Sequence, residues 1–206
     1  MAELGPVRWP PAPIETDRLV LRESQAQDRA AFIELFASPE VHTYLGGPQP
    51  RDGLEHALPE VPGQRPGTFV ADLDGALIGA VMLDPHADRP GHIRPDVGET
   101  ELGYLFLPHA WGCGYAAEAC AAALAWVSDA LPGTRVVLRT QTANNRSMRL
   151  AAKLGFTEVE RFESYGAEQW FGVWSSVTRS SSRWTSPAAE SGRADTEHGG
   201  SGSGRS

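Results

Sequence analysis

The amino-acid sequence predicts a mixed α/β domain of the α+β type, in which a mostly antiparallel central sheet is flanked by helices. Segments with an apolar residue at every second position alternate with segments of helical spacing along most of the chain. Two of the strand-like segments are joined only by a tight turn, which is typical of antiparallel pairing. The chain has 206 residues, which suits one domain with tails and a sizeable core.

Alternation of apolar and polar residues predicts the strands. In residues 16–23, Leu19 and Leu21 share one face. Residues 68–73 and 76–83 flank an Asp-Gly dipeptide, which has the turn chemistry of a two-residue hairpin. The other expected strands are 98–107, 135–141, 157–162 and 169–175.

Helical spacing of apolar residues predicts four helices, at 27–37, 51–58, 115–131 and 145–154. The first ends at Ser38-Pro39, because proline disfavours helical backbone in the residue before it. The second carries the weakest pattern. The third is rich in alanine, the best helix former, and stops at Pro132-Gly133. Gly155 ends the fourth.

The two ends of the chain lack the composition of a packed core. Residues 179–206 are mostly Ser, Gly, Arg and Glu, and such a segment cannot bury enough apolar surface to offset its ordering entropy. We expect a disordered tail there and a flexible, proline-rich leader at 1–13. The folded domain is expected at 14–178, with a loop at 84–97.

The charge and composition exclude several classes of protein. Asp and Glu number 26 against 18 Lys and Arg, which gives a net charge of −8 and argues against a general nucleic-acid binder. No apolar run approaches the roughly 20 residues of a membrane-spanning helix, and the first residues lack the pattern of a secretory signal. Two cysteines, Cys113 and Cys120, form no disulfide framework, so a cytoplasmic location is expected.

The most specific chemical pattern lies at 105–119, where a strand leads through a glycine-containing loop into a helix. A helix N-terminus presents unpaired N–H groups and the positive end of a dipole, and Gly112 and Gly114 allow a close approach of the backbone. Together they suit a phosphate or pyrophosphate site. The same two glycines also suit a tight turn without a ligand.

Two known phosphate motifs fit this loop poorly. A P-loop is excluded, because no Gly-Lys-Ser/Thr follows. Gly112, Gly114 and Ala117 nearly match a dinucleotide fingerprint, but the strand at 135–141 ends without the carboxylate that would hold the ribose. A nucleotide-binding oxidoreductase is therefore disfavoured.

Four segments resemble one known family. His-Ala-Trp-Gly-Cys-Gly-Tyr-Ala at 109–116 resembles the Gln/Arg-x-x-Gly-x-Gly/Ala motif of the GCN5-related N-acetyltransferases (GNAT). Glu-Thr-Asp-Arg-Leu-Val-Leu-Arg at 15–22 and Glu-Leu-Gly-Tyr at 101–104 resemble the first and fourth strands of its branch of ribosomal-protein N-terminal acetyltransferases, the RimJ/RimL type. Asn-Asn-Arg-Ser at 144–147, with Lys-Leu-Gly-Phe at 153–156, resembles the Asn-x-x-Ser helix of that branch.

The resemblance covers residues 14–175 and implies an N-acetyltransferase domain whose sheet splays apart after the fourth strand. Acetyl-CoA, the implied cosubstrate, would insert its pantetheine there like an extra strand and place its pyrophosphate on the amides of 112–116. The implied cofactor-binding residues are Leu105, Phe106, Leu107, His109, Gly112, Cys113, Gly114, Tyr115, Ala116 and Asn144. No metal site is expected.

The resemblance also implies catalytic roles. Glu101 matches the general base of the branch, with Glu99 in reserve as an anchor for a cationic amine. Ser147 matches the serine proposed to protonate the leaving thiolate. Each also has an ordinary structural interpretation, as a solvated strand carboxylate or a first-turn helix serine, and Asn144 suits a helix N-cap. Tyr104 is expected in the core.

This chain departs from the family pattern at two positions of the loop. His109 replaces the usual Gln or Arg, and Cys113 stands where a basic residue is common. Both changes weaken the positive field around a pyrophosphate. Arg146 and Arg149 are candidates for the CoA phosphates, although a solvated helix face explains them equally well.

The expected function is transfer of an acetyl group from acetyl-CoA to a primary amine of a protein N-terminus or a small molecule, by direct attack. The alternative is a non-catalytic acyl-CoA-binding sensor or interaction module of the same fold. The expected partners are acetyl-CoA and an amine acceptor, without nucleic acid or membrane, in a monomer or homodimer. Without the tail the charge is −9, which suits a cationic acceptor.

Overall fold

The structure is a computed structural model that describes residues 7, 9–85 and 99–175. Its strands are β1 (Ile14–Glu15), β2 (Val20–Arg22), β3 (Thr68–Leu73), β4 (Ala76–Pro85), β5 (Glu99–Phe106), β6 (Arg135–Gln141), β7 (Thr157–Ser164) and β8 (Ala167–Ser175). Its helices are the 3₁₀ turns η1 (Ala26–Asp28) and η2 (Pro108–Ala110) and the α-helices α1 (Arg29–Ala37), α2 (Arg51–Ala57), α3 (Tyr115–Ala130) and α4 (Asn145–Leu154).

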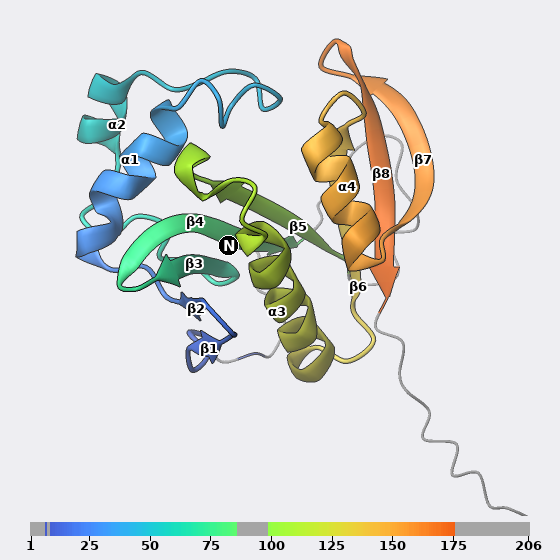
Figure 1. Cartoon of the computed structure of the whole chain (residues 1–206), viewed down its shortest axis with the longest axis horizontal. Helices are drawn as coiled ribbons and strands as arrows, with labels where there is room; N and C mark the ends of the chain where they lie inside the picture. The colour runs from blue at the N-terminus through green and yellow to red at the C-terminus, as the bar shows by residue number, and fades with distance from the viewer. Residues whose placement is uncertain (1–6, 8, 86–98, 176–206) are drawn as a thin grey trace, which may run out of the picture. The chain divides into compact units, whose positions relative to one another are not determined.

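The eight strands form a single sheet in the order β1-β2-β3-β4-β5-β6-β8-β7 (Figure 1). Every neighbouring pair of these described strands is antiparallel except β5 and β6, which run parallel. Helix α3 links β5 to β6, as a parallel pair requires a crossover. The predicted α+β architecture, with a mostly antiparallel mixed sheet flanked by helices, is therefore confirmed.

Helices pack on both faces of the sheet. The larger core includes Leu21, Phe69 and Leu102 of the strands and the apolar side of α3 and α4. The smaller core joins α1 to the other face through Phe32, Leu35, Val70, Leu77, Ala80 and Leu107. Within the described residues, none of the helices is long and apolar enough to cross a membrane.

The first predicted strand, 16–23, is a small hairpin in the structure. Thr16 closes a turn, because its N–H donates to the carbonyl of Leu19 and its hydroxyl oxygen accepts the N–H of Leu19, both at 2.9 Å. The chain then reverses, and Ile14 pairs with Leu21 across β1 and β2. A side chain that hydrogen-bonds its own local backbone gives the chain an alternative to a continued strand.

A buried cluster of charges ties β2 to the first helix. Arg22 donates to both carboxylate oxygens of Asp28, at 2.7 and 2.9 Å, and to Asp72 of β3 at 2.7 Å. These two carboxylates raise the pKa of the Arg22 guanidinium. Asp28 also accepts the N–H of Gln25 at the start of η1, which lies at the beginning of the helix predicted for 27–37. Removing one member of such a buried pair leaves an uncompensated charge, so the cluster fixes where α1 starts.

The sheet splits between β5 and β6. The two strands pair only from Glu99 with Arg135 to Glu101 with Val137. Beyond these residues β5 stays on β4 as far as Phe106, while β6 follows β8. We call this divergence the fork. The expected splay of the sheet therefore begins where β5 and β6 stop pairing. Strand β5, which precedes the glycine loop, forms one arm of the fork.

Several expectations fall partly or wholly outside the described residues. The predicted tail at 179–206 lies outside them, as do residues 1–6 and 8 of the leader and residues 86–97 of the predicted loop. Within the predicted leader, Trp9 is packed: its ring lies edge-on to Phe69, with centroids 4.9 Å apart, and edge-on to Trp126.

Candidate active site

The loop from β5 to α3 has the geometry expected of an anion cradle. Gly112 and Gly114 adopt φ angles of 82° and 84°, a left-handed conformation that other residues rarely adopt. The carbonyl of Gly114 accepts the N–H groups of Ala117 and Glu118, which begins α3. Within the described part of the chain, the N–H groups of residues 112–116 donate to no protein acceptor. They are available to a negatively charged ligand.

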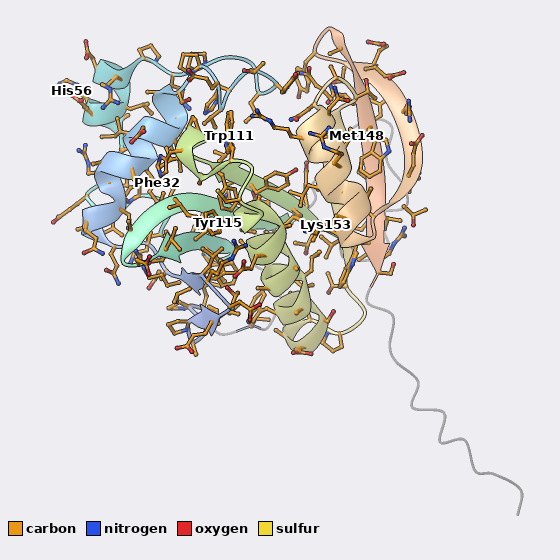
Figure 2. The ribbon with its side chains drawn as sticks, viewed as in Figure 1. Phe32, His56, Trp111, Tyr115, Met148 and Lys153 are labelled. Atoms are coloured by element: carbon orange, nitrogen blue, oxygen red, sulfur yellow. The ribbon has the colours of Figure 1, made fainter. Side chains whose placement is uncertain are left out.

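Two aromatic contacts hold this loop. The indole N–H of Trp111 donates to the carbonyl of Phe106 at 2.7 Å, which folds the loop back on the end of β5. The guanidinium of Arg146, from α4, lies 4.5 Å from the centroid of the Trp111 ring. Arg146 therefore reaches across the fork to the loop. Figure 2 shows Trp111 on the side of β5 and α3 and Met148 on α4 opposite.

The strand arm of the fork provides only part of the predicted cofactor edge. Leu105 and Phe106 lie beyond the last residue that pairs with β6, so their fork side has no strand partner. The main chain of Leu107 is already used, because its N–H donates to Ile78 and its carbonyl accepts from Ala110. Leu107 is also buried in the smaller core. His109 and Cys113 are exposed on the loop.

A charged pair that was not predicted from the sequence, Arg18 and Glu118, contacts the loop and the start of α3. Arg18, from the turn between β1 and β2, donates to the carbonyl of Cys113 at 3.0 Å and lies 4.5 Å from the centroid of the Tyr115 ring. Glu118, in the first turn of α3, accepts from the Arg18 side chain at 2.8 Å and from Thr16 at 2.6 Å. The hint in the sequence is a carboxylate, Glu118, in the first turn of a helix with no cation close by in the chain. Nothing in the sequence indicates that its partner lies 100 residues away.

The start of α4 brings a second predicted group to the fork. Asn144 is its N-cap, since the side-chain oxygen accepts the N–H of Ser147 at 3.2 Å. The Ser147 hydroxyl is buried and lies 2.5 Å from the hydroxyl of Tyr104 on β5. Burial raises the pKa of Tyr104, so its hydroxyl keeps its proton. Tyr104 packs against the larger core as expected, but its hydroxyl connects the two arms.

The opposite face of the fork is charged. Glu101 lies 3.5 Å from the guanidinium of Arg139, and Glu99 lies 3.4 Å from that of Arg135, counting the nearest side-chain atoms. The Glu99 side chain is 5% exposed, and one of its carboxylate oxygens has no hydrogen-bond partner within the described residues. Glu99 and Arg135 are register partners, whereas Arg139 lies two residues beyond Val137, the partner of Glu101. We call these four side chains the charged face.

A surface depression of about 650 Å³ lies beyond the end of α1 and includes the first residue of η2. Its lining residues include Glu34, Glu40, Pro48, Gln49, Arg51 and Pro108. Nearby, the carbonyl of Tyr44 accepts from the side chain of Gln141 at the end of β6, at 3.2 Å. The loop between α1 and α2 thus contacts the β6 arm.

The structure thus brings three chemical elements to one fork. They are an N–H cradle at the start of α3, a pair of hydroxyls that spans the two arms, and a charged face on β5 and β6. No group of three or more His, Cys, Asp or Glu side chains able to hold a metal lies within the described residues. This arrangement fits two ligands: a thioester cofactor that carries phosphate groups, and an amine acceptor. The fork and its cradle define the class of acyl-CoA-dependent transferases.

Comparison with known proteins identifies the family. The family model of the acetyltransferase (GNAT) domain matches residues 18–157, and the chain belongs to this family. It is 31% identical over 162 residues to an uncharacterised N-acetyltransferase, YoaA, of Bacillus subtilis, with 74% of this chain and 86% of the relative covered. It is 30% identical over 160 residues to the FsC-acetyl coenzyme A-N(2)-transacetylase of Aspergillus fumigatus, covering 72% and 66%.

Solved structures show the same fold. An acetyltransferase of the GNAT family from Bacillus anthracis superposes with a TM-score of 0.63 at 21% identity, covering 79% of this chain and 97% of that one. The aminoglycoside acetyltransferase AAC(6')-Ib, in complex with ribostamycin and coenzyme A, gives 0.63 at 17% identity, covering 80% and 99%. The chain is an acyl-CoA-dependent N-acetyltransferase, and acetyl-CoA is its cosubstrate.

Proposed function

We propose that the chain transfers an acetyl group directly from acetyl-CoA to a primary amine bound over the charged face. The position of Glu101 carries the proposal, because it is the last residue of β5 that pairs with β6. Its carboxylate stands where the arms of the fork meet. The amine nitrogen attacks the thioester carbon, a C–N bond forms as the C–S bond breaks, and the electron pair leaves on sulfur. The amine must lose a proton in the process.

We assign that proton to Glu101, which accepts it directly or through a water molecule. Arg139 lies close enough to keep the carboxylate directed at the fork. The buried carboxylate of Glu99, two residues back on the same strand face, supports a second role as an anchor for a cationic amine. Two carboxylates beside the reacting centre attract an ammonium ion before it loses its proton.

The cofactor would be held mainly by the main chain. The free N–H groups of residues 112–116, with Tyr115 and Ala116 in the first helical turn, suit the pyrophosphate. The edge of β5 at Leu105 and Phe106 has no strand partner and suits the pantetheine amides, because an extended ligand can add to an open strand edge. One acceptor on this edge, the Phe106 carbonyl, already binds the indole N–H of Trp111. His109, Cys113 and Asn144 would lie along the bound cofactor. We assign Leu107 to the core instead, because its N–H and its carbonyl already make hydrogen bonds within the protein.

The leaving sulfur is expected to be stabilised by hydrogen bonds rather than by full proton transfer from the protein. An ordinary thiol has a pKa of about 8.5 and an ordinary tyrosine one of about 10. Burial raises the pKa of Tyr104 further, so a thiolate is too weak a base to deprotonate it. Ser147, held by Tyr104, can donate its hydrogen to sulfur while accepting one from the tyrosine.

The acceptor is proposed to be a protein N-terminus or a small-molecule amine, as in the RimJ/RimL-like branch. The four motifs of the chain support this branch. One curated relative is named an FsC N(2)-transacetylase, and a protein of the same fold has been solved in complex with ribostamycin and coenzyme A. The charged face contains two guanidinium groups besides its carboxylates. It therefore suits an amine with an anionic group nearby better than a polycation.

The test is a thiol-release screen in which acetyl-CoA and longer acyl-CoAs are combined with N-terminal peptides, amino acids, aminoglycosides and polyamines. We expect turnover with acetyl-CoA and an N-terminal peptide or a carboxylate-bearing amine. Coenzyme A binding without thiol release across the whole panel would contradict the assigned acceptor class.

A further inference from the structure

The glycine loop has to hold a polyanionic cofactor with little help from its own side chains. The loop side chains at positions 109 and 113 are a histidine and a cysteine, and neither carries a fixed positive charge. Both are exposed, and Cys113 is a free thiol whose side chain donates only weakly, to the carbonyl of Trp111 at 3.8 Å. A cation from elsewhere in the fold would compensate.

Arg18 brings a guanidinium to the loop. It donates to the carbonyl of Cys113 at 3.0 Å and stacks on Tyr115 at 4.5 Å. A Cβ atom built on Gly114 would lie 3.5 Å from the Arg18 terminal nitrogen. The guanidinium thus touches three consecutive residues of the cradle, although Arg18 precedes them by 95 positions or more.

Glu118 fixes the guanidinium in this place. One carboxylate oxygen accepts the Arg18 side chain at 2.8 and 2.6 Å, and the other accepts the main-chain N–H of Arg18 at 2.9 Å. Thr16 donates to the latter oxygen as well, at 2.6 Å. The pKa of Arg18 is raised by this hydrogen-bonded carboxylate, and the pKa of Glu118 is lowered despite its desolvation, so both groups carry charge.

The remaining donors of Arg18 are the reason to assign it a ligand. A guanidinium has five N–H groups in a fixed plane. The contacts with Glu118 and Cys113 occupy three of them, and the side chain is 45% exposed. Two N–H groups of its terminal nitrogens are therefore left for a ligand, and guanidinium groups favour phosphate oxygens.

We propose that Arg18 is a phosphate-binding residue for coenzyme A, held in place by Glu118 and supplying a positive charge to a glycine loop that has no arginine or lysine of its own. The proposal rests on the assignment of residues 112–116 as the pyrophosphate cradle. It gives the hairpin of β1 and β2 a function, because that hairpin carries Arg18 to the start of α3. It also explains why a carboxylate is tolerated beside a polyanion site, since Glu118 acts through Arg18 as a positioning residue.

Calorimetric titration with coenzyme A and with 3′-dephospho-coenzyme A tests the proposal without using activity. We expect Arg18→Gln to weaken coenzyme A binding about tenfold or more, the usual effect of losing a charge-assisted hydrogen bond. Arg18→Lys should lose less, because it keeps the charge but not the planar fork. Equal losses for both ligands assign the contact to the pyrophosphate, and a loss confined to coenzyme A assigns it to the 3′-phosphate.

The decisive variant is Glu118→Gln. Removing a carboxylate near a polyanion should strengthen binding if only net charge mattered, whereas the proposal predicts weaker binding because Arg18 loses its support. The matched control is Arg161→Gln. Arg161 has a similar exposed fraction, 48%, and pairs with Glu158 on β7, at the opposite end of the sheet from β1. It should leave both affinities unchanged.

Unchanged affinities in folded Arg18→Gln and Arg18→Lys would overturn the proposal, as would tighter binding in Glu118→Gln or an equal loss in the Arg161 control. Circular dichroism of each variant checks folding, and Arg18→Lys keeps the test open should Arg18→Gln unfold. Gly114→Glu separates this proposal from the underlying assignment. If that variant binds coenzyme A normally, the cradle itself is misassigned, whatever Arg18 does.

Discussion

The cradle at the start of α3 and the charged face of β5 and β6 are built in different ways. On the β5–α3 arm, the predicted cofactor site consists largely of main-chain N–H groups, shaped by Gly112 and Gly114. The acceptor site that we propose on the charged face consists of side chains, with carboxylates on β5 and guanidinium groups on β6. Main-chain groups do not depend on residue identity, whereas a charged side chain changes its chemistry with a single substitution.

The difference indicates where specificity resides. A cradle of amides and a helix dipole can bind the same coenzyme A in many sequences. In our proposal, acceptor choice depends on the charged face and on the loop between α1 and α2, which contacts β6 through Tyr44. Variants in the cradle and variants on the charged face should therefore separate cleanly into cofactor effects and acceptor effects.

Gly114→Glu should have the largest effect, a loss of coenzyme A affinity of about a thousandfold. A new carboxylate would stand within a few ångströms of the pyrophosphate, and two like charges about 4 Å apart at a protein surface repel by about 4 kcal/mol. Acetyl-CoA should raise the melting temperature of the wild-type protein and leave that of the variant unchanged, as measured by thermal unfolding.

Backbone strain needs a separate control, because Gly114 has a φ of 84°. Gly133 has a φ of 85° after the far end of α3, and a Cβ added there would meet nothing within 4 Å. Gly133→Glu should lose a similar amount of stability but keep its response to acetyl-CoA. A response lost in both variants would mean that strain, rather than charge at the cradle, is responsible.

Glu101→Gln should lower kcat about a hundredfold, the lower end of what a positioned general base contributes. The amide keeps the shape of the side chain but cannot take the proton. Coenzyme A affinity should not change, because Glu101 lies on the charged face and away from the cradle. Steady-state kinetics across pH, with calorimetry of coenzyme A, measure both. An unchanged kcat and pH profile would remove Glu101 as the base.

Arg139→Gln should raise the acceptor KM about tenfold for a carboxylate-bearing amine and lower it for a polycation. The guanidinium lies 3.5 Å from Glu101, so its loss leaves a more negative face. Arg135→Gln, next to Glu99 and farther from the open end of the fork, should have a smaller effect. Competition between the two acceptor types in one assay provides the measurement. Equal changes for both types would show that Arg139 does not discriminate by charge.

Features that depend on nearby residues could be predicted from the sequence. The Asp74-Gly75 turn has the positive φ angles, 53° and 86°, that a two-residue hairpin needs. Asn144 caps α4, and Gly155 ends it with a φ of 85°. Each follows from steric or hydrogen-bonding properties within a few residues, which a single sequence contains.

Contacts between distant segments could not be predicted. In the sequence, Arg18 is one polar position of a predicted strand, and its partner Glu118 is one more residue of an alanine-rich helix. The alternation of Tyr104 with apolar neighbours predicts a core position, yet its hydroxyl meets Ser147 of α4. Such pairs depend on how the sheet brings its segments together, and no local period encodes that arrangement.

Tyr104→Phe should have the smallest effect, because it removes the one hydroxyl that connects the arms while leaving both binding sites intact. We expect kcat to fall a fewfold as Ser147 loses its hydrogen-bond partner, with the acceptor KM and the coenzyme A affinity unchanged. A drop in either affinity would mean that the hydroxyl pair shapes a binding site instead of assisting the leaving sulfur.

The same variant also has a signature in alkaline unfolding. Burial raises the pKa of Tyr104 in the folded state above its ordinary value near 10, so the unfolded chain releases this proton first. The contribution that this pKa difference makes to the free energy of unfolding is therefore fully present below about pH 10 and is lost as the pH rises beyond it. Urea unfolding at increasing pH should show a shallower decline of the free energy of unfolding for Tyr104→Phe than for the wild type.

Cys120 is a buried thiol whose pKa is also raised, so it lowers the stability in the same direction as the pH rises. The comparison is therefore best made in a Cys120→Ala background. Parallel declines in that background would show that the Tyr104 hydroxyl is solvated, and hence that it does not stand as a buried link between the arms of the fork.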